Sequence, residues 1–432
     1  MMIFAAVVSL VPGVAQAQHA LDPADPVGAA LIASFERTPG GGLRCDVRRL
    51  DTRLSFALRW HAGYRATFAL SQFSESEAGL QVVFRVTSRR TGQQHYFGQS
   101  FHLPPGPRPK RQAGQIDGGF FLGEGEYDVD WMLADGEGRS CRDRWNVRLK
   151  PGARDKAAAQ SLEPGEVAPI VIEWNGTPRE PKRRFRVAIV LHVAPLFPNS
   201  IRLTSFDQSF LTTMLTSVLE KTPFLESSVY AVSLEKQQAI FESDRLDADS
   251  FRGLLEAMED LELGTITLDQ YTRPDGHVDV LAEILNREIG ADQPPDAILF
   301  VGPNNGHTVK FPRERLEGGA QVPPLFYLHL DFYSWRSPWA DTIERLTRSQ
   351  GGKVFTIHDP HALVKALKEI EADLTRAGGL KPPAAEAFSR FSPAELPDPR
   401  ELVALVVPPP PLRWEDSVAP DPMLWILEEA RQ

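Results

Sequence analysis

Two different patterns of hydrophobic and polar positions divide the chain. Between residues 43 and 150, apolar residues alternate with polar ones, as Leu54, Phe56, Leu58 and Trp60 do with the residues between them. Short turn sequences, such as the acidic and glycine residues at 135–138, separate these runs. Alternation with closely spaced turns is typical of antiparallel sheets that bury one face. We therefore predict an all-β sandwich over residues 43–150.

The pattern changes at about residue 185. Residues 187–193 form a near-continuous apolar run, typical of a parallel strand covered by helices on both faces. Amphipathic segments then alternate with further apolar runs, and one such segment begins at a capping pair, Ser205 and Gln208. The apolar runs lie at 229–233, 238–241, 297–301, 325–328 and 354–357. This alternation predicts a doubly wound α/β domain over residues 185–375.

In the rest of the chain, apolar residues recur at no regular spacing. Residues 18–42 and 151–184 are interpreted as linkers, the second with one short apolar run that could add an edge strand. After residue 376 closely spaced prolines, part of the 36 in the chain, rule out regular helix or sheet through most of the tail. We therefore expect a Pro-rich tail at 376–432.

The first residues suggest export. Residues 1–14 are apolar, and Ala15-Gln16-Ala17 follows as a small-x-small cleavage signal, so residues 1–17 are predicted to be a signal peptide. A short N-terminal strand is the alternative. The two cysteines, Cys45 and Cys141, are then expected to form a disulfide in an oxidising compartment, two free thiols being the alternative.

Charge and hydropathy limit which classes of partner and which cellular location we expect. The chain has 57 Asp and Glu against 47 Lys and Arg, which argues against binding nucleic acid through its phosphates. No other apolar run reaches the ~20 residues needed to cross a bilayer. We therefore expect a secreted or periplasmic protein with no transmembrane segment after signal cleavage.

The order of elements from residue 185 resembles the von Willebrand factor type A domain. The resemblance rests on the first strand at 187–193, the strand pair at 229–241, the buried strand at 297–301, and Gly351-Gly352 before the last strand and helix. The whole chain is similar to bacterial secreted proteins related to this family, which often carry an N-terminal β-domain. Gly125 and Tyr127, which open a strand, are similar to the tyrosine corner of immunoglobulin-like sandwiches.

The resemblance implies a fold without the family's metal site. Family members that bind a divalent cation use Asp-x-Ser-x-Ser after the first strand and an Asp after the fourth, because such cations require hard oxygen ligands. Here the first motif's places hold His192, Ala194 and Leu196, and Gly302-Pro303 follows the fourth strand. We therefore expect no metal and no other cofactor.

Polar residues nevertheless follow the predicted strands. They are His192, Asn304, Asn305, His307, Asp331 and His358. The carboxyl ends of parallel strands share one edge, where such sheets bind ligands. Two histidines and a carboxylate could hold zinc or supply a general base. The same residue types also occur at strand ends simply because they satisfy local backbone groups.

No strong catalytic motif is present. The chain lacks Gly-x-Ser-x-Gly, the P-loop sequence and the dinucleotide-binding glycine fingerprint. The sequence thus predicts an α/β doubly wound (von Willebrand factor A-like) domain preceded by an all-β immunoglobulin-like sandwich. The expected function is non-enzymatic recognition of a protein or of a cell-envelope surface. The alternatives are a divergent metal-dependent hydrolase using His192, His307 and Asp331, and a structural component of an envelope assembly.

Overall fold

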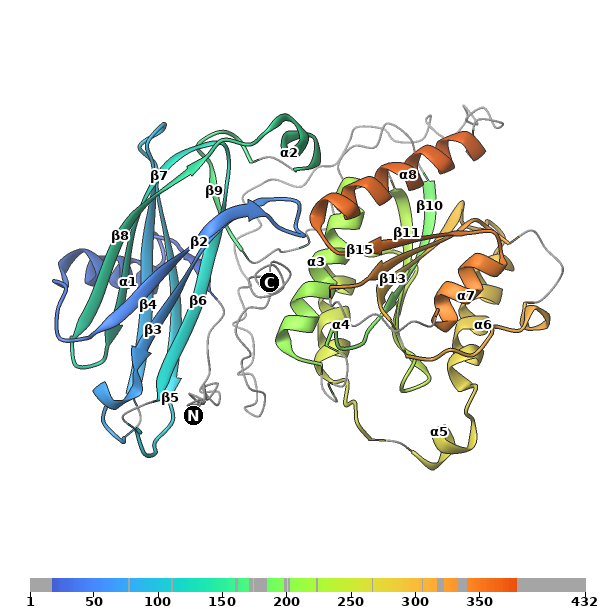
Figure 1. Cartoon of the computed structure of the whole chain (residues 1–432), viewed down its shortest axis with the longest axis horizontal. Helices are drawn as coiled ribbons and strands as arrows, with labels where there is room; N and C mark the ends of the chain where they lie inside the picture. The colour runs from blue at the N-terminus through green and yellow to red at the C-terminus, as the bar shows by residue number, and fades with distance from the viewer. Residues whose placement is uncertain are drawn as a thin grey trace, which may run out of the picture.

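The computed structural model describes residues 18–378 except 77, 110–111, 160–161, 171–173, 175–184, 198–199, 201–202, 223, 266, 305, 317–321 and 333–339. The predicted signal peptide, Asn305 and nearly all of the Pro-rich tail therefore lie outside the described residues. The described chain forms two units side by side, which we call the N-terminal unit (residues 18–169) and the C-terminal unit (residues 185–378) (Figure 1).

Two sheets make up the N-terminal unit. A five-stranded sheet has the order β1-β5-β4-β7-β8, and a four-stranded sheet has the order β2-β3-β6-β9. The strands are β1 (His19–Leu21), β2 (Cys45–Leu54), β3 (Trp60–Ala69), β4 (Ala78–Ser88), β5 (Gln94–Leu103), β6 (Ala113–Leu122), β7 (Gly125–Asp135), β8 (Ser140–Leu149) and β9 (Val167–Pro169). All pairings within them are antiparallel. A short 3-10 helix, η1 (Leu70–Gln72), follows β3.

Because apolar and polar residues alternate along these strands, every second side chain points into the space between the two sheets. Tyr64 on β3, Phe84 on β4 and Trp131 on β7 are each at most 1% exposed and pack edge to face. The predicted disulfide is confirmed: Cys45 on β2 and Cys141 on β8 are bonded, with their Cα atoms 6.1 Å apart. It joins an edge strand of one sheet to an edge strand of the other.

The linker predicted at 18–42 is wrong. This segment contributes β1 to the five-stranded sheet and then the helix α1 (Pro26–Arg37). Asp25 caps α1 by accepting a hydrogen bond from the Gly28 amide, and a proline occupies the first turn. Phe35 of α1 is fully buried against the outer face of the sheet, beside Val83 and Met132. The helical spacing of apolar residues in this segment extends over few turns and follows polar residues and prolines, so the sequence pattern did not predict a helix.

The second predicted linker, 151–184, also contains regular structure. The helix α2 (Ala153–Ala158) follows β8, and β9 pairs with β6 at the edge of the four-stranded sheet, as the short apolar run indicated.

A single six-stranded sheet forms the centre of the C-terminal unit, in the order β12-β11-β10-β13-β14-β15. Its strands are β10 (Phe185–His192), β11 (Phe224–Ser233), β12 (Gln238–Ser243), β13 (Ala297–Pro303), β14 (Leu325–Leu330) and β15 (Lys353–Ile357). The predicted apolar runs therefore do form strands. All neighbours run parallel except β12, which is antiparallel to β11.

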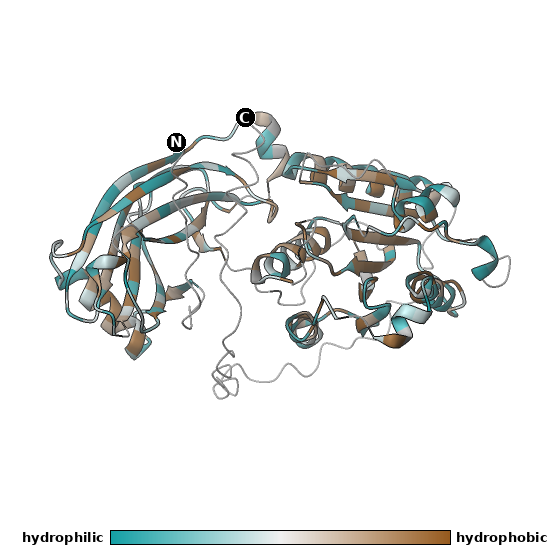
Figure 2. Cartoon of the chain, turned by 60° about the horizontal axis from the view of Figure 1, so that its bottom comes forward, coloured by the Kyte–Doolittle hydropathy of each residue, from teal (hydrophilic) through white to brown (hydrophobic). Residues whose placement is uncertain are grey.

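Helices cover both faces of this sheet, and Figure 2 shows its hydrophobic strands between two helical layers. They are α3 (Ser205–Lys221), α4 (Ala248–Glu259), α5 (Leu268–Thr272), α6 (Gly276–Ile289), α7 (Thr342–Ser349) and α8 (Pro360–Gly378), with a 3-10 turn η2 (Arg313–Arg315). Side chains of α3, α4 and α8 pack on one face, and those of α6 and α7 on the other.

The capping box of α3 lies one residue earlier than predicted. The Thr204 hydroxyl accepts from the Asp207 amide, and the Asp207 carboxylate accepts from the Thr204 amide. Asp207, rather than Gln208, is the partner because its fully buried carboxylate also accepts a hydrogen bond from the Leu196 amide. It thereby ties the chain leaving β10 to the start of the helix.

The predicted fold class needs correction. An α/β doubly wound domain of von Willebrand factor A type does not describe the chain as a whole, because most of the described regular structure is β. This β structure forms three sheets, and the sheet of the C-terminal unit is mixed rather than all parallel. The long antiparallel strands β2 to β8 of the N-terminal unit supply most of this β structure, and the antiparallel edge strand β12 makes the other sheet mixed.

The two units are joined by the turn between β2 and β3. Phe56 and Leu58 of this turn are at most 5% exposed because they enter the hydrophobic core of the C-terminal unit. The Phe56 ring packs against Phe210 on α3 at a centroid distance of 5.0 Å, and against Phe332 at 5.2 Å. Leu58 adopts φ +55°, an uncommon backbone conformation for a branched side chain, which this packing holds in place.

Candidate functional site

The strand-end residues predicted from the sequence fall into two groups at one edge of the C-terminal sheet. His192 ends β10, and Asn304 and His307 follow the neighbouring β13. Asp331 follows β14, and its amide donates to the Ile357 carbonyl at the end of β15, one residue before His358. Because the four strands are parallel and adjacent, all these residues lie at the same sheet edge.

His192 is buried at this edge, with 2% of its surface exposed. Its Nδ1 lies 3.2 Å from the Pro303 carbonyl oxygen, which can only accept, so Nδ1 carries the proton of a neutral ring. Burial, with a smaller contribution from nearby His307, lowers the pKa of His192 to about 4. His192 is therefore neutral at pH 7 and almost fully buried.

A second histidine accompanies His307. His277 at the start of α6 stacks on the His307 ring, with centroids 4.2 Å apart. The Thr342 hydroxyl at the start of α7 lies 3.5 Å from His277 Nε2 and 3.0 Å from the Val309 carbonyl, and the Thr342 amide donates to the His307 carbonyl. The first turns of α6 and α7 thus hold the loop that follows β13.

Burial dominates the electrostatics of this pair. Burial, followed by the charge of His307, lowers the pKa of His277 to about 4, and burial also lowers the pKa of His307. Both rings are therefore neutral at pH 7.

Tyr327 and Asp341 complete the polar layer beneath the loop. The fully buried Tyr327 hydroxyl donates to Asp341 Oδ2 over 3.1 Å, and Asp341 Oδ1 accepts from the Glu344 amide as the cap of α7. Burial, reinforced by the Asp341 carboxylate, raises the pKa of Tyr327 well above its usual value. The carboxylate therefore holds a helix and a strand together.

Asp331 and His358 lie apart from these histidines, two and three strands from β10. The His358 side chain is 63% exposed and approaches its neighbour Asp359 at 3.4 Å. Among the described residues, no three His, Cys, Asp or Glu side chains are grouped so that they could hold a metal ion. The zinc set suggested by His192, His307 and Asp331 is therefore not assembled.

Several exposed apolar side chains belong to segments that lie at this same edge. In the described part of the C-terminal unit, the large apolar residues that are most exposed are Phe197 (38%), Leu268 (80%), Tyr271 (79%) and Val309 (37%). Phe197 follows β10 and Val309 follows β13, whereas Leu268 and Tyr271 lie on α5, which protrudes from the unit (Figure 1). We call these four residues the apolar rim.

The turn between β11 and β12 positions α5 at the edge. Lys236 Nζ donates to the Thr265 carbonyl at 2.8 Å, and Gln270 Nε2 on α5 donates back to the Lys236 carbonyl at 2.8 Å. Since β11 is parallel to β10, this turn lies at the carboxyl end of the strands. The apolar rim therefore follows three adjacent strands: β11, β10 and β13.

Sequence reasoning missed His277, Tyr327 and the apolar rim. His277 opens α6, and the signal that could have identified it is that a helix leading into a parallel strand, here β13, begins at the edge where that strand ends. Tyr327 was read only as part of a buried apolar strand. The rim gave no sequence signal, because exposure of single apolar residues is common.

Comparisons with known proteins leave the family open. No family model matches the chain, and no curated protein matches it. Among solved structures, the minor pilin PilB from Streptococcus sanguinis is 9% identical over 72% of this chain and 90% of its own, with a TM-score of 0.27. The structural-genomics target SoR45 is 14% identical over 26% of this chain and 96% of its own, with a TM-score of 0.17.

A third similar structure is β-glucuronidase 2 of Bacteroides uniformis, 8% identical over 67% of this chain and 36% of its own, with a TM-score of 0.18. Scores this low assign neither fold nor function. The von Willebrand factor A and immunoglobulin-like resemblances read from the sequence thus find no support in these comparisons.

Proposed function

We propose that this chain is an exported, non-enzymatic recognition protein, and that the apolar rim is its contact surface for another protein. The observation that carries the proposal is that Phe197, Leu268, Tyr271 and Val309 are all exposed and follow neighbouring strands at one sheet edge. Exposed apolar side chains that cluster at one place mark interaction sites more often than scattered ones do. Aromatic anchors such as Tyr271 are enriched at protein interfaces.

The chemistry beneath the rim supports binding rather than turnover. A general base needs access to substrate and a pKa near the working pH. His192 and His277 are at most 2% exposed, and burial lowers both pKa values to about 4. These rings give the rim a rigid support, because stacking and backbone hydrogen bonds hold the loop after β13.

One observation, the disulfide, supports export. The Cys45–Cys141 disulfide is of the kind that persists in oxidising compartments. Among the described residues, no helix is long and apolar enough to cross a membrane. A secreted or periplasmic place accords with the predicted signal peptide.

A pair of matched variants tests the contact surface. The double variant L268A/Y271A removes the two most exposed side chains of the rim, and V27A removes an apolar side chain that is 67% exposed on α1 of the other unit. Both change the surface rather than a core, so melting temperatures should stay within about a degree or two of the parent. Partners cross-linked in envelope extract and quantified by mass spectrometry form the readout.

We expect a set of proteins captured by the parent and by V27A to fall at least tenfold with L268A/Y271A. Equal capture by all three proteins would remove the rim as a recognition surface. Turnover of ester, phosphate or peptide substrates that is lost in a His307→Ala variant would favour the hydrolase alternative instead.

A further inference from the structure

The last turn of helix α4 lies at the same sheet edge as the apolar rim. Gln208, in the first turn of α3, donates from Nε2 to the Met258 carbonyl near the end of α4 at 3.1 Å. Helix α3 begins where the chain has left β10, because Asp207 accepts from the Leu196 amide at 2.9 Å. The end of α4 is therefore at the carboxyl end of the parallel strands, where α5 is held as well.

Helix α5 presents two apolar side chains on one face. Leu268 and Tyr271 are 80% and 79% exposed, and residues three apart in a helix lie on the same side. The backbone beneath them is fixed, because Gln237 Nε2 donates to the Arg273 carbonyl at 2.9 Å and Gln270 Nε2 donates to the Lys236 carbonyl at 2.8 Å. A surface ordered in advance loses little conformational entropy when a partner binds.

The chain on either side of this apolar pair is acidic. Residues 256–276 contain one basic residue, Arg273, and the acidic residues Glu256, Glu259, Asp260, Glu262, Asp269 and Asp275. The side chains of Glu256, Glu259 and Glu262 are exposed. Within the part of the chain that the structure describes, no cation pairs with any of these three.

The position of these charges at a helix end is unfavourable. The carboxyl end of a helix carries partial negative charge, so basic side chains stabilise it and carboxylates do not. Helix α4 has no basic residue in its last turn. Partial burial, followed by the charges of Asp260 and Glu256, raises the pKa of Glu259. The carboxylates therefore repel one another, and a cationic group from a partner would relieve this repulsion.

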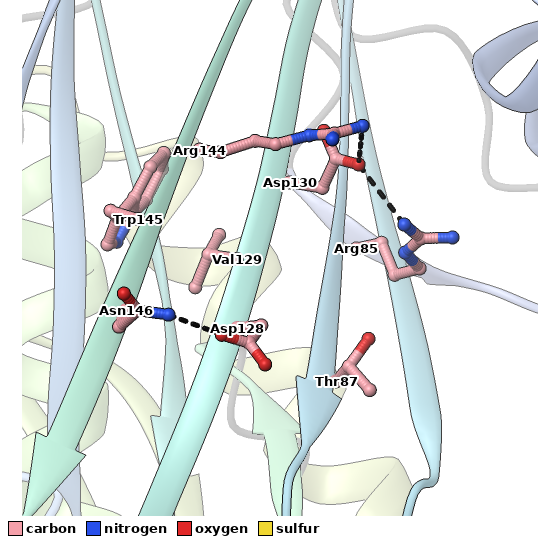
Figure 3. Close-up of a pocket in the computed structure, with 8 residues that line it drawn as sticks. All are labelled: Arg85, Thr87, Asp128, Val129, Asp130, Arg144, Trp145 and Asn146. Carbon is pink, nitrogen blue, oxygen red and sulfur yellow. Dashed lines mark hydrogen bonds and ion pairs between the residues drawn. The ribbon is translucent and has the colours of Figure 1, made fainter.

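Several carboxylates elsewhere in the molecule have cations beside them. On the outer face of the five-stranded sheet, Asp130 accepts from Arg85 at 3.1 Å and from Arg144 at 3.0 Å (Figure 3). On α8, Asp373 pairs with Lys353 at 2.8 Å. The end of α4 differs from these places, because its negative charge is not neutralised within the described fold.

We propose that the surface formed by Glu256, Glu259, Glu262, Leu268 and Tyr271 binds a positively charged, amphipathic segment of a partner protein. The inference rests on the recognition role proposed above and adds the chemistry of the partner. Apolar side chains of the segment contact Leu268 and Tyr271, and its lysines or arginines pair with the three carboxylates. We call these five residues the α4–α5 surface.

Other occupants match this surface less well. A second copy would bring the same acidic residues, in a chain whose net charge is −10. The chain's own last segment, 415–432, is acidic too, with Arg431 as its one basic residue. Like charges that face each other across an interface suppress binding. Among the described residues, no three His, Cys, Asp or Glu side chains are grouped to hold a metal ion.

Matched variants separate specific charge from total charge. The first replaces the three carboxylates of the surface by amides: E256Q/E259Q/E262Q. The control makes the same change in net charge at three exposed carboxylates elsewhere in the C-terminal unit: E283Q/E314Q/E371Q. The first variant should melt at or above the temperature of the parent, because it removes negative charge from the end of α4. A lower melting temperature would mean that these carboxylates stabilise the fold, which contradicts the proposal.

The probe is a fluorescent synthetic peptide that carries leucines on one helical face and lysines on the other. A second peptide with glutamate in place of lysine has the same apolar face. Fluorescence anisotropy measures the binding of both to the full chain. We expect the parent and E283Q/E314Q/E371Q to bind the lysine peptide equally well and the glutamate peptide not at all.

The surface variants should bind the lysine peptide more weakly. Each exposed ion pair changes an equilibrium constant by about twofold, so E256Q/E259Q/E262Q should lose about eightfold in affinity. L268A/Y271A should lose a similar factor, because the apolar contact is removed. Raising sodium chloride from about 50 to about 300 mM should reduce the difference between the parent and the charge variant, since salt screens exposed charges.

Equal weakening by both triple variants would overturn the proposal, because binding would then follow net charge alone. Full affinity in E256Q/E259Q/E262Q or in L268A/Y271A would also overturn it. So would self-association in sedimentation that L268A/Y271A abolishes, which would assign the surface to a second copy.

The cross-linking experiment in envelope extract distinguishes this inference from the function on which it rests. Capture that is lost in L268A/Y271A but retained in E256Q/E259Q/E262Q would leave the recognition role standing and refute a cationic partner. Capture that is unchanged in both would remove the recognition surface itself. Loss of the same proteins in both variants, with capture retained in E283Q/E314Q/E371Q, is the result that we expect.

Discussion

The Ser217 hydroxyl on α3 donates a buried 2.8 Å hydrogen bond to the backbone carbonyl of Phe56, which lies 161 positions earlier in the chain. This bond satisfies a carbonyl that the β2–β3 turn carries into the core of the C-terminal unit. Nearby, Arg59 pairs with Glu220 at 3.4 Å, and Asp155 on α2 pairs with His361 on α8 at 3.2 Å. The two units therefore share apolar and polar contacts, and the turn couples their stabilities.

The first prediction concerns this coupling. F56A should destabilise the protein by about 3–5 kcal/mol, as truncation of a buried Phe does, and should raise amide exchange along α3. The matched control F73A truncates an equally buried ring, 5% exposed, which packs on Phe68 inside the N-terminal unit. Hydrogen exchange monitored by mass spectrometry distinguishes the two. Unchanged exchange along α3 in F56A would contradict the coupling.

The second prediction tests the contact between β10 and the end of β13. A methyl group added at Gly302 would lie 2.6 Å from His192 Cβ and 2.8 Å from the His192 carbonyl oxygen, and neither atom can rotate away. G302A should therefore cost about 1–3 kcal/mol, the usual cost of overpacking. G79A, in strand β4, is the control because a methyl group there meets nothing within 4 Å. Urea titration measures both, and equal midpoints would refute this packing.

A third prediction is that stability falls as the pH drops from about 7 to about 4. Burial lowers the pKa of His61, His192 and His277 to about 4, whereas in the unfolded chain these rings take up protons near 6.5. Between these values the unfolded state binds more protons, so acid favours unfolding. Each ring contributes a slope of at most about 1.4 kcal/mol per pH unit.

Urea unfolding at half-unit pH steps measures this slope. H192Q should reduce it, because one ring no longer takes up a proton on unfolding. The comparison protein is H358Q, which changes an exposed ring at the same sheet edge. A stability that is flat between pH 4 and 7 in the parent would show that the buried rings are not excluded from water.

The fourth prediction concerns the disulfide. Cys45 and Cys141 enclose a loop with a sequence separation of 96 residues, so reduction or the variant C45A/C141A should lower stability by roughly 4–5 kcal/mol in the chain-entropy model. The loss should appear in the unfolding of the N-terminal unit, followed by its tryptophan fluorescence, because both cysteines pack against that core. An unchanged unfolding midpoint under reducing conditions would contradict this expectation.

Local patterns in the sequence were enough for most of the regular elements. The apolar runs at 187–193 and 297–301 form β10 and β13, and the alternation around Tyr127 and Trp131 forms β7. The pairing of Cys45 with Cys141 also followed from the sequence, since only two cysteines were available. These features depend on the nearest residues along the chain, where periodicity is a direct consequence of burial on one or both faces.

Only the tertiary structure decided which residues of the strand-end edge are accessible and what they meet. His192, Asn304, His307, Asp331 and His358 follow parallel strands that end at one edge, and Asn305 lies outside the described residues. The burial of the histidines depends on α6, α7 and the loop after β13. The sequence could not show that His277 stacks on His307, that the β2–β3 turn enters the other unit, or that 18–42 packs as a strand and a helix. Each of these contacts joins segments distant in the chain, and their energy comes from surfaces that exist only once both segments have folded.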